Sequence, residues 1–247
     1  MIPGPLVVVA HGSRDPRSAA TVRALVDLVR ATAPETDARA AFLDLSEPPV
    51  GDVLAGLHAE GHQHVVVVPL LLGRAYHARV DLPGLVTAVT ARLPRLEVSI
   101  AGVLGADPLL EAVAVDRLTD AGADLAAADL GVVLAAVGSS HAPANAVVAR
   151  LARRWARHGC QVSPAFASAT KPDVAAAVAK LRARGARRFA VASWFLAPGL
   201  LPDRVRAQAG QAAPGVLIAG PLGADARVAG VVLDRYAEAL ATTARSA

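Results

Sequence analysis

Short Val-rich runs alternate with longer Ala- and Leu-rich segments along the chain. In the first half, apolar runs near residues 5–10, 38–45, 64–70 and 96–103 predict β-strands. These runs are mostly apolar and do not alternate strictly between apolar and polar residues, which is typical of strands buried on both faces. Because helical segments join them, they indicate a parallel sheet with helices on both sides, an α/β arrangement.

The segment after the first predicted strand illustrates the helical pattern. Asp15 is placed to cap a helix, Pro16 suits its first turn, and Pro34 lies just beyond its end. Right-handed crossovers then make the sheet doubly wound, with ligands outside the carboxyl ends of the strands. The residues that recur at helical spacing are Val22, Leu25, Val26 and Val29.

The two halves of the chain repeat each other in order and at nearly constant separation. We therefore expect two similar doubly wound parallel-sheet domains from an internal duplication, residues 1–124 and 125–247. The matching stretches are VVVAHGSRDPRSAATVRALV and VVLAAVGSSHAPANAVVARL, from Val7 and Val132; AFLDLSEPPV and AFASATKPDV, from Ala41 and Ala165; and GVLGAD and GPLGAD, from Gly102 and Gly220.

Composition narrows the classes of function. Of 247 residues, 54% are apolar, enough to bury two cores, yet no uninterrupted apolar run is long enough to span a membrane. The first residues lack the features of a signal peptide, and a single cysteine, Cys160, excludes an internal disulfide, so we expect a cytoplasmic protein. The net charge of +4 comes mostly from Arg, but no nucleic-acid motif accompanies it.

Two histidines follow strands that we expect to be neighbours. His11 comes directly after the first strand, in HGSRDP, and His77 lies in PLLLGRAYHARVDLP after the third. Alone, each would more often be structural; together, on one edge of one sheet, they are candidate metal ligands. In the repeat they align with Val137 and Leu201, so both are absent from the second half. This absence favours one metal site, in the first half.

Other polar residues are candidates with open alternatives. Asp44 follows the second strand and could bind metal, accept a proton or serve the local fold, whereas Glu47 suits the start of a helix. Arg14, Arg74 and Arg79 flank the histidines and suit substrate carboxylates, although surface solubility is an alternative.

The histidine-rich segment LHAEGHQH is an alternative metal site. His58 and His62 are four residues apart, but Gly61 is expected to end the helix between them. His58, His62 and His64 would then lie at the amino end of the third strand, away from the ligand edge. We expect them to be structural.

With HGSRDP, FLDLSEPP and PLLLGRAYHARVDLP, the chain resembles the sirohydrochlorin chelatases of siroheme and cobalamin synthesis over its whole length. The resemblance implies the class II chelatase fold and ATP-independent insertion of Fe²⁺ or Co²⁺ into sirohydrochlorin or a related polycarboxylate tetrapyrrole. It places the two loop histidines of the family on His11 and His77. The family often has Glu where this chain has Asp44.

We therefore expect a lyase with His11, His77 and Asp44 as catalytic residues and with both histidines as metal ligands. Ser13, Arg14 and Arg79 are expected to bind the macrocycle. No permanently bound cofactor, nucleic acid or membrane is expected, and a monomer follows from fusion of the two domains. The alternatives are a non-catalytic tetrapyrrole or metal carrier of the same fold, and a phosphate-handling enzyme, which would need Arg in place of Ala10.

Overall fold

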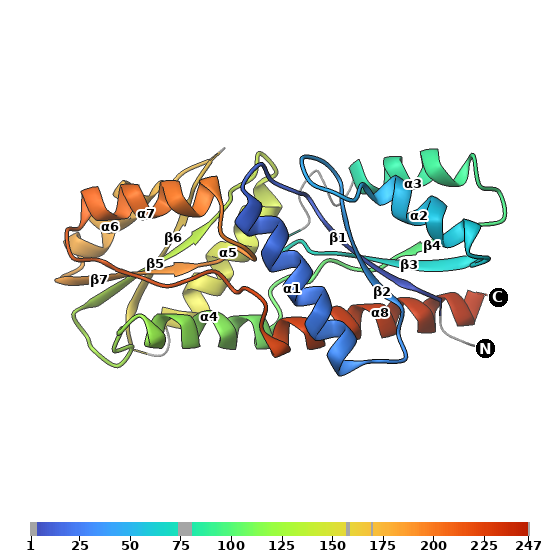
Figure 1. Ribbon diagram of the computed structural model, residues 1–247. Coiled ribbons are helices and arrows are strands. Elements are labelled where there is room, and N and C mark those ends of the chain that lie inside the picture. Colours follow the sequence, from blue (N-terminus) through green and yellow to red (C-terminus); the bar gives the residue numbers. More distant parts are fainter. Residues whose placement is uncertain (1–3, 74–80, 157–158, 169, 247) are drawn as a thin grey trace. The chain divides into compact units, whose positions relative to one another are not determined.

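A computed structural model describes residues 4–73, 81–156, 159–168 and 170–246, where strands and helices alternate along the chain (Figure 1). The strands are β1 (Leu6–Ala10), β2 (Ala38–Phe42), β3 (His64–Pro69), β4 (Glu97–Ile100), β5 (Leu130–Ala136), β6 (Gln161–Phe166), β7 (Arg188–Ser193) and β8 (Leu217–Ile218). The helices are α1 (Pro16–Thr32), α2 (Val50–Ala59), α3 (Leu82–Thr90), α4 (Pro108–Asp120), α5 (Ala142–Trp155), α6 (Val174–Ala183), α7 (Leu200–Ala212) and α8 (Ala226–Ser246).

The strands form two parallel sheets of four strands with the same order. One sheet has the order β2-β1-β3-β4 and the other β6-β5-β7-β8. In the first, Val9 of β1 lies opposite Ala41 of β2 and Pro69 of β3. Every residue of β1 and β5 is buried, as expected for central strands covered on both faces. The predicted α/β fold with two doubly wound sheets is confirmed.

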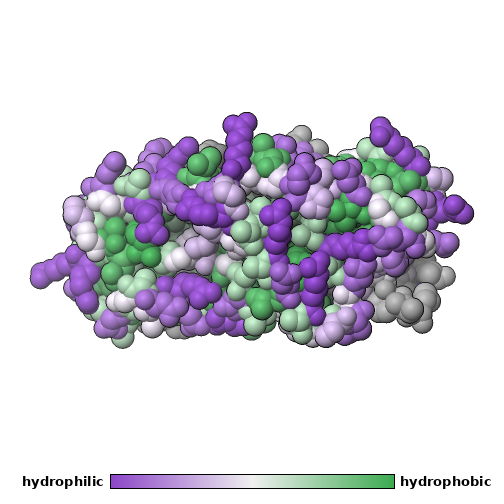
Figure 2. Space-filling model, viewed as in Figure 1, coloured by the Kyte–Doolittle hydropathy of each residue, from purple (hydrophilic) through white to green (hydrophobic). Residues whose placement is uncertain are grey.

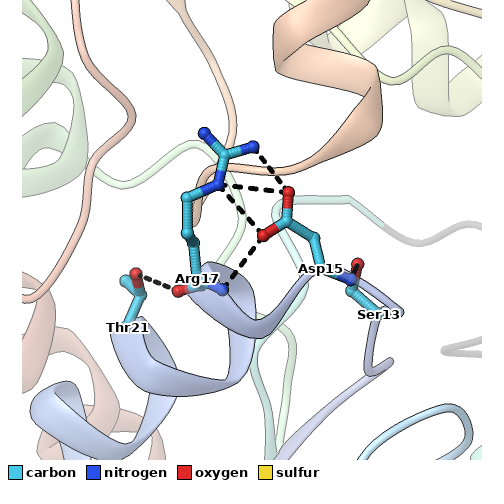
Figure 3. A network of polar contacts seen from close by, with 4 residues as sticks. All are labelled: Ser13, Asp15, Arg17 and Thr21. Carbon is cyan, nitrogen blue, oxygen red and sulfur yellow. Dashed lines mark hydrogen bonds and ion pairs between the residues drawn. The ribbon is translucent and has the colours of Figure 1, made fainter.

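Helix α1 begins and ends where its sequence predicts. The Asp15 carboxylate accepts a hydrogen bond from the amide of Arg17 (3.0 Å) and thereby caps the helix. Figure 3 shows the same carboxylate also held by the Arg17 guanidinium. The predicted apolar positions of this helix are buried. The second predicted strand ends earlier than expected, at Phe42, and three residues later Leu45, with a φ of 60°, turns the chain away from the first strand.

The chain forms two compact units, each containing one sheet. The first comprises Met1–Asp107 and Ala224–Ala247, and the second Pro108–Gly223. These units differ from the predicted domains 1–124 and 125–247. Helix α4 follows the last strand of the first sheet but belongs to the second unit, and α8 follows the last strand of the second sheet but belongs to the first.

Contacts within each unit explain this exchange of helices. Helix α8 packs against α1, β3 and β4, and the hydroxyl of Tyr236 on this helix donates a 2.6 Å hydrogen bond to the carbonyl of Gly4. Helix α4 packs against β7. Its Glu111 pairs with Arg154 of α5 and accepts a hydrogen bond from the indole of Trp155 (3.2 Å). Each helix is thus tied to its unit by both packing and polar contacts.

In the ranges that the structure describes, no helix is both long and apolar enough to cross a membrane. On the face shown in Figure 2, hydrophobic patches lie between hydrophilic side chains.

Candidate metal centre

The loops that carry the candidate residues all leave the carboxyl edge of the first sheet. His11 follows β1, and Asp44 follows β2 after one intervening residue. The segment that begins at Leu71 follows β3. Since β1 pairs in parallel with both neighbours, these three loops emerge side by side with His11 in the middle. The predicted adjacency of the first and third strands is confirmed.

Several of the predicted site residues lie outside the described residues. His77, Arg74 and Arg79 belong to the undescribed segment 74–80. The prediction that His11 and His77 share one metal ion therefore stays a prediction. The sheet order does establish that the segment containing His77 starts beside the strand that carries His11.

The loops that carry His11 and Asp44 touch closely through their backbones. His11 is half-buried, and its carbonyl accepts a 2.9 Å hydrogen bond from the amide of Asp44. Gly12 has a φ of 95°, and a Cβ atom placed there would lie 1.7 Å from the carbonyl oxygen of Asp44. A side chain at Gly12 would therefore force the two loops apart, so this glycine is required by both its conformation and its close contact.

Ser13 has a local structural contact next to His11. Its hydroxyl accepts a hydrogen bond from the amide of Asp15 (3.1 Å), which orders the entry into α1 (Figure 3). Hydrogen bonds from the Arg17 guanidinium hold the pKa of the Asp15 carboxyl below its usual value. The carboxylate of Asp15 thus caps helix α1 and forms an ion pair with Arg17.

Asp44 and Arg14 are both exposed on this edge. One carboxylate oxygen of Asp44 accepts a 2.8 Å hydrogen bond from the amide of Leu45, which fixes the direction of the side chain. Arg14 makes no hydrogen bond or ion pair with any residue that the structure describes, so its guanidinium is available for an anionic ligand. Glu47 is exposed, and its carbonyl accepts a hydrogen bond from the guanidinium of Arg23 (2.8 Å).

A second cluster of possible ligands lies at the opposite, amino edge of the first sheet. Among the described residues, Asp37, Glu60 and His62 bring one ligand atom each to within 4.8 Å of one another. Arg39 bridges the two carboxylates, and its hydrogen bonds lower the pKa of both. The guanidinium therefore already supplies the positive charge that a metal ion would bring.

The histidine-rich segment lies where the sequence predicts. Helix α2 ends at Ala59, Gly61 has a φ of 97°, and His64 begins β3. Of the three histidines, only His62 joins the cluster at the amino edge. His64 instead shares a 2.9 Å hydrogen bond with the hydroxyl of Ser99. These contacts support the structural interpretation of this segment.

The second unit repeats the backbone of the candidate site without its chemistry. Val137 replaces His11, and its carbonyl accepts hydrogen bonds from the amide (2.9 Å) and hydroxyl (3.0 Å) of Ser168, which replaces Asp44. Gly138 has a φ of 86°, and a Cβ atom there would lie 2.2 Å from the carbonyl oxygen of Ser168. The turn therefore belongs to the fold, whereas the imidazole and carboxylate occur in one unit only.

One residue at this edge escaped the sequence analysis. Ser46 lies between Asp44 and Glu47 in FLDLSEPP, and its hydroxyl bonds to the backbone of Ser13, 33 residues away. No local spacing signals such a contact. The repeat offers a partial signal, because Thr170 also has a hydroxyl at the corresponding position.

Comparisons with known proteins cover nearly the whole chain. A sequence model of the CbiX family matches residues 5–121 and 131–239. A sirohydrochlorin ferrochelatase of Bacillus subtilis (strain 168) is 25% identical over 243 residues, which are 96% of this chain and 92% of that protein. A sirohydrochlorin cobaltochelatase of Priestia megaterium is 25% identical over 208 residues, 81% of this chain and 66% of that protein.

A solved structure is similar in fold. SirB from Bacillus subtilis with Fe3+ superposes with a TM-score of 0.83 at 24% identity, over 98% of this chain and 97% of that one. The two sheets and their helices therefore have the architecture found in that protein.

Proposed function

The chain belongs to the CbiX family, and we propose that it is a sirohydrochlorin chelatase that inserts Fe²⁺ or Co²⁺ into the macrocycle. The observation that carries this proposal is the convergence of three loops at one sheet edge. His11 and Asp44 lie on two loops in direct backbone contact, and the segment that contains His77 begins on the adjacent strand. The relatives named for iron and for cobalt insertion support the same reaction.

The metal ion is a substrate in this proposal, so it must be held and then released. His11 and His77 supply two neutral nitrogen ligands and leave coordination positions open for the pyrrole nitrogens. As the divalent ion enters the macrocycle, two pyrrole N–H bonds break and two protons leave. We assign one of them to the exposed Asp44 carboxylate, which is oriented by the amide of Leu45 and belongs to a residue whose own amide is bonded to the carbonyl of His11; the other leaves to solvent water.

Binding of the macrocycle is assigned to cationic and polar groups around the histidines. The exposed guanidinium of Arg14 suits a substrate carboxylate, since it has no ion pair with the described residues. Arg79 and Ser13 complete the set that we assign to the macrocycle. The hydroxyl of Ser13 accepts a hydrogen bond from Asp15 and still has its own hydrogen to donate.

The proposal has further parts that concern the whole protein. Residues 1–124 and 125–247 are two copies of one ancestral sequence, which the two separate matches of the family model support. The reaction needs neither ATP nor a permanently bound cofactor, and the protein acts as a cytoplasmic monomer without a nucleic-acid or membrane partner. The single cysteine, Cys160, is buried and unpaired, in agreement with a reducing compartment.

The test is a spectrophotometric assay of sirohydrochlorin with Fe²⁺ and with Co²⁺ under anaerobic conditions. The wild-type protein should accelerate insertion, and His11→Ala and His77→Ala should each lower kcat/KM by at least about 100-fold. His62→Ala, at the opposite edge of the sheet, serves as the control and should retain activity. A carrier would bind both the metal and the macrocycle without accelerating insertion. That result, or near-normal turnover in both loop variants, would refute the proposal.

A further inference from the structure

We propose that Ser46 is a positioning residue that holds the loop of Asp44 in register with the loop of His11. This inference rests on the proposed function, because it assigns a role in metal insertion. Its basis is a pair of hydrogen bonds between the two loops. The hydroxyl of Ser46 accepts from the amide of Ser13 (3.1 Å) and donates to the carbonyl of Ser13 (3.0 Å).

These bonds extend the pairing of β1 and β2 beyond the ends of both strands. The amide of Leu43 donates to the carbonyl of Ala10 (3.0 Å), and the amide of Asp44 donates to that of His11 (2.9 Å). The ladder cannot continue through the backbone, because Leu45 has a left-handed conformation with a φ of 60°. Beyond this point the side chain of Ser46, rather than the backbone, bonds to the partner loop, at the amide and the carbonyl of Ser13.

Asp44 is consequently fixed from both sides. Its own amide is bonded to His11, and two residues later the chain is bonded again to Ser13. Loss of the Ser46 hydroxyl removes the second attachment and leaves the amide and carbonyl of Ser13 without that partner. The loop of Asp44 then keeps its backbone bond to His11 and the bond from Arg23 to the carbonyl of Glu47 but is no longer attached to Ser13, which loosens the mutual placement of the carboxylate and the imidazole.

The second unit satisfies the same backbone groups in a different way. There, the backbone amide of Ser139 donates to the side-chain oxygen of Asn145 (2.9 Å), and the side-chain amide nitrogen of Asn145 donates to the backbone carbonyl of Ser139 (2.7 Å). Ser139 corresponds to Ser13, and Asn145, on helix α5, corresponds to Ala19. A local side chain therefore suffices to complete this turn in the unit that lacks the histidine.

This difference separates a structural role from a positioning role. If only the backbone groups of Ser13 needed partners, an Asn on the following helix would serve as it does at Asn145. In the first unit the side-chain tie between the loops runs from Ser46 to Ser13, two residues beyond His11, whereas in the second unit it runs from Ser168 to the carbonyl of Val137, at the position of His11 itself. We therefore assign the tie to the geometry of the metal centre.

The experiment compares three variants with the wild type: Ser46→Ala, Ser46→Thr, and Ser46→Ala combined with Ala19→Asn. Each is characterised by thermal unfolding, by Co²⁺ affinity from calorimetry, and by kcat and KM for metal insertion into sirohydrochlorin. Ser46→Ala should weaken Co²⁺ binding and lower kcat, each by about 10- to 100-fold, with the KM for sirohydrochlorin within about threefold. Ser46→Thr retains the hydroxyl and should keep both the Co²⁺ affinity and kcat close to their wild-type values.

The variant that combines Ser46→Ala with Ala19→Asn gives the backbone of Ser13 the kind of side-chain partner that Asn145 provides for Ser139 in the second unit. It should recover the unfolding temperature lost in Ser46→Ala but not its kcat or Co²⁺ affinity. Recovery of activity together with stability would overturn the positioning role, as would unchanged kcat and Co²⁺ affinity in Ser46→Ala. If the wild type binds Co²⁺ but inserts no metal, the proposed function fails, and the Co²⁺ affinities still decide the role of Ser46. If the wild type binds no Co²⁺, both proposals are refuted.

Discussion

Replacing Gly12 by alanine tests the close approach of the two loops at the candidate site. Gly12 combines a φ of 95° with the Asp44 carbonyl oxygen only 1.7 Å from the position that a Cβ atom would take. Gly61→Ala is a matched control, because Gly61 has nearly the same φ, 97°, and no atom within 4 Å of its Cβ position. Both variants place a non-glycine residue at a positive φ, but only the alanine at position 12 collides with the carbonyl oxygen of Asp44.

The expected magnitudes follow from these contacts. A non-glycine residue in the left-handed region costs about 1–2 kcal/mol, which should be the whole effect of Gly61→Ala. At Gly12 the loop of Asp44 must also move away, which breaks the bond between Asp44 and His11 and the two bonds between Ser46 and Ser13. Each is worth about 1 kcal/mol net, so Gly12→Ala should lower the free energy of unfolding by about 4 kcal/mol.

Urea unfolding followed by far-UV circular dichroism measures both variants, and the insertion assay measures their activity. Gly12→Ala should be less stable than Gly61→Ala and nearly inactive. Gly138→Ala, where the Cβ atom would lie 2.2 Å from the carbonyl oxygen of Ser168, should also be destabilised but should keep its metal affinity. If Gly12→Ala costs no more stability than Gly61→Ala, the two loops are not held as closely as we infer.

Two further outcomes are expected. Arg17 holds the pKa of the Asp15 carboxyl lower in the folded protein than in the unfolded chain. Ionised Asp15 therefore stabilises the folded protein at pH values above its pKa in the unfolded chain, and this stabilisation is lost as the pH falls through its pKa in the folded protein. Asp15→Asn should thus lower the Tm at pH 6, by an amount that shrinks toward pH 3; a constant difference would contradict this linkage. His141→Ala in the second unit should leave Co²⁺ affinity within about twofold, since we propose that the metal ligands lie in the first unit; a large loss measured by calorimetry would place a ligand at His141.

Local patterns in the sequence were sufficient for most of the fold. The capping residue Asp15 and the spacing of the buried positions predicted α1 correctly, because a helix is specified by neighbours three and four residues apart. Mostly apolar strands joined by helices predicted parallel sheets. The position of His11 directly after the first strand correctly placed it at the carboxyl edge of that sheet, and the expected strand order correctly placed β3 beside β1.

The exchange of α4 and α8 between the units was decided by tertiary structure. Each helix follows the last strand of its repeat, and the two repeats have matching segments at this point, so either sheet offers an apolar face to either helix. Contacts such as the bond from Tyr236 to the carbonyl of Gly4 join residues 232 positions apart, and no periodicity encodes them. The sequence repeat and the compact units consequently have different boundaries.

The fine geometry of the candidate site also required the folded chain. The sequence identified His11 and Asp44 as residues of suitable chemistry that follow predicted strands, since residue type and position suffice for that inference. It did not identify Ser46, whose hydroxyl meets Ser13 only after β1 and β2 have paired and Leu45 has turned the chain. The chemistry of a side chain can be read from a single residue, so the sequence was sufficient to identify His11 and Asp44. The register of two loops depends on the pairing of the strands before them, so only the tertiary structure showed the contact of Ser46.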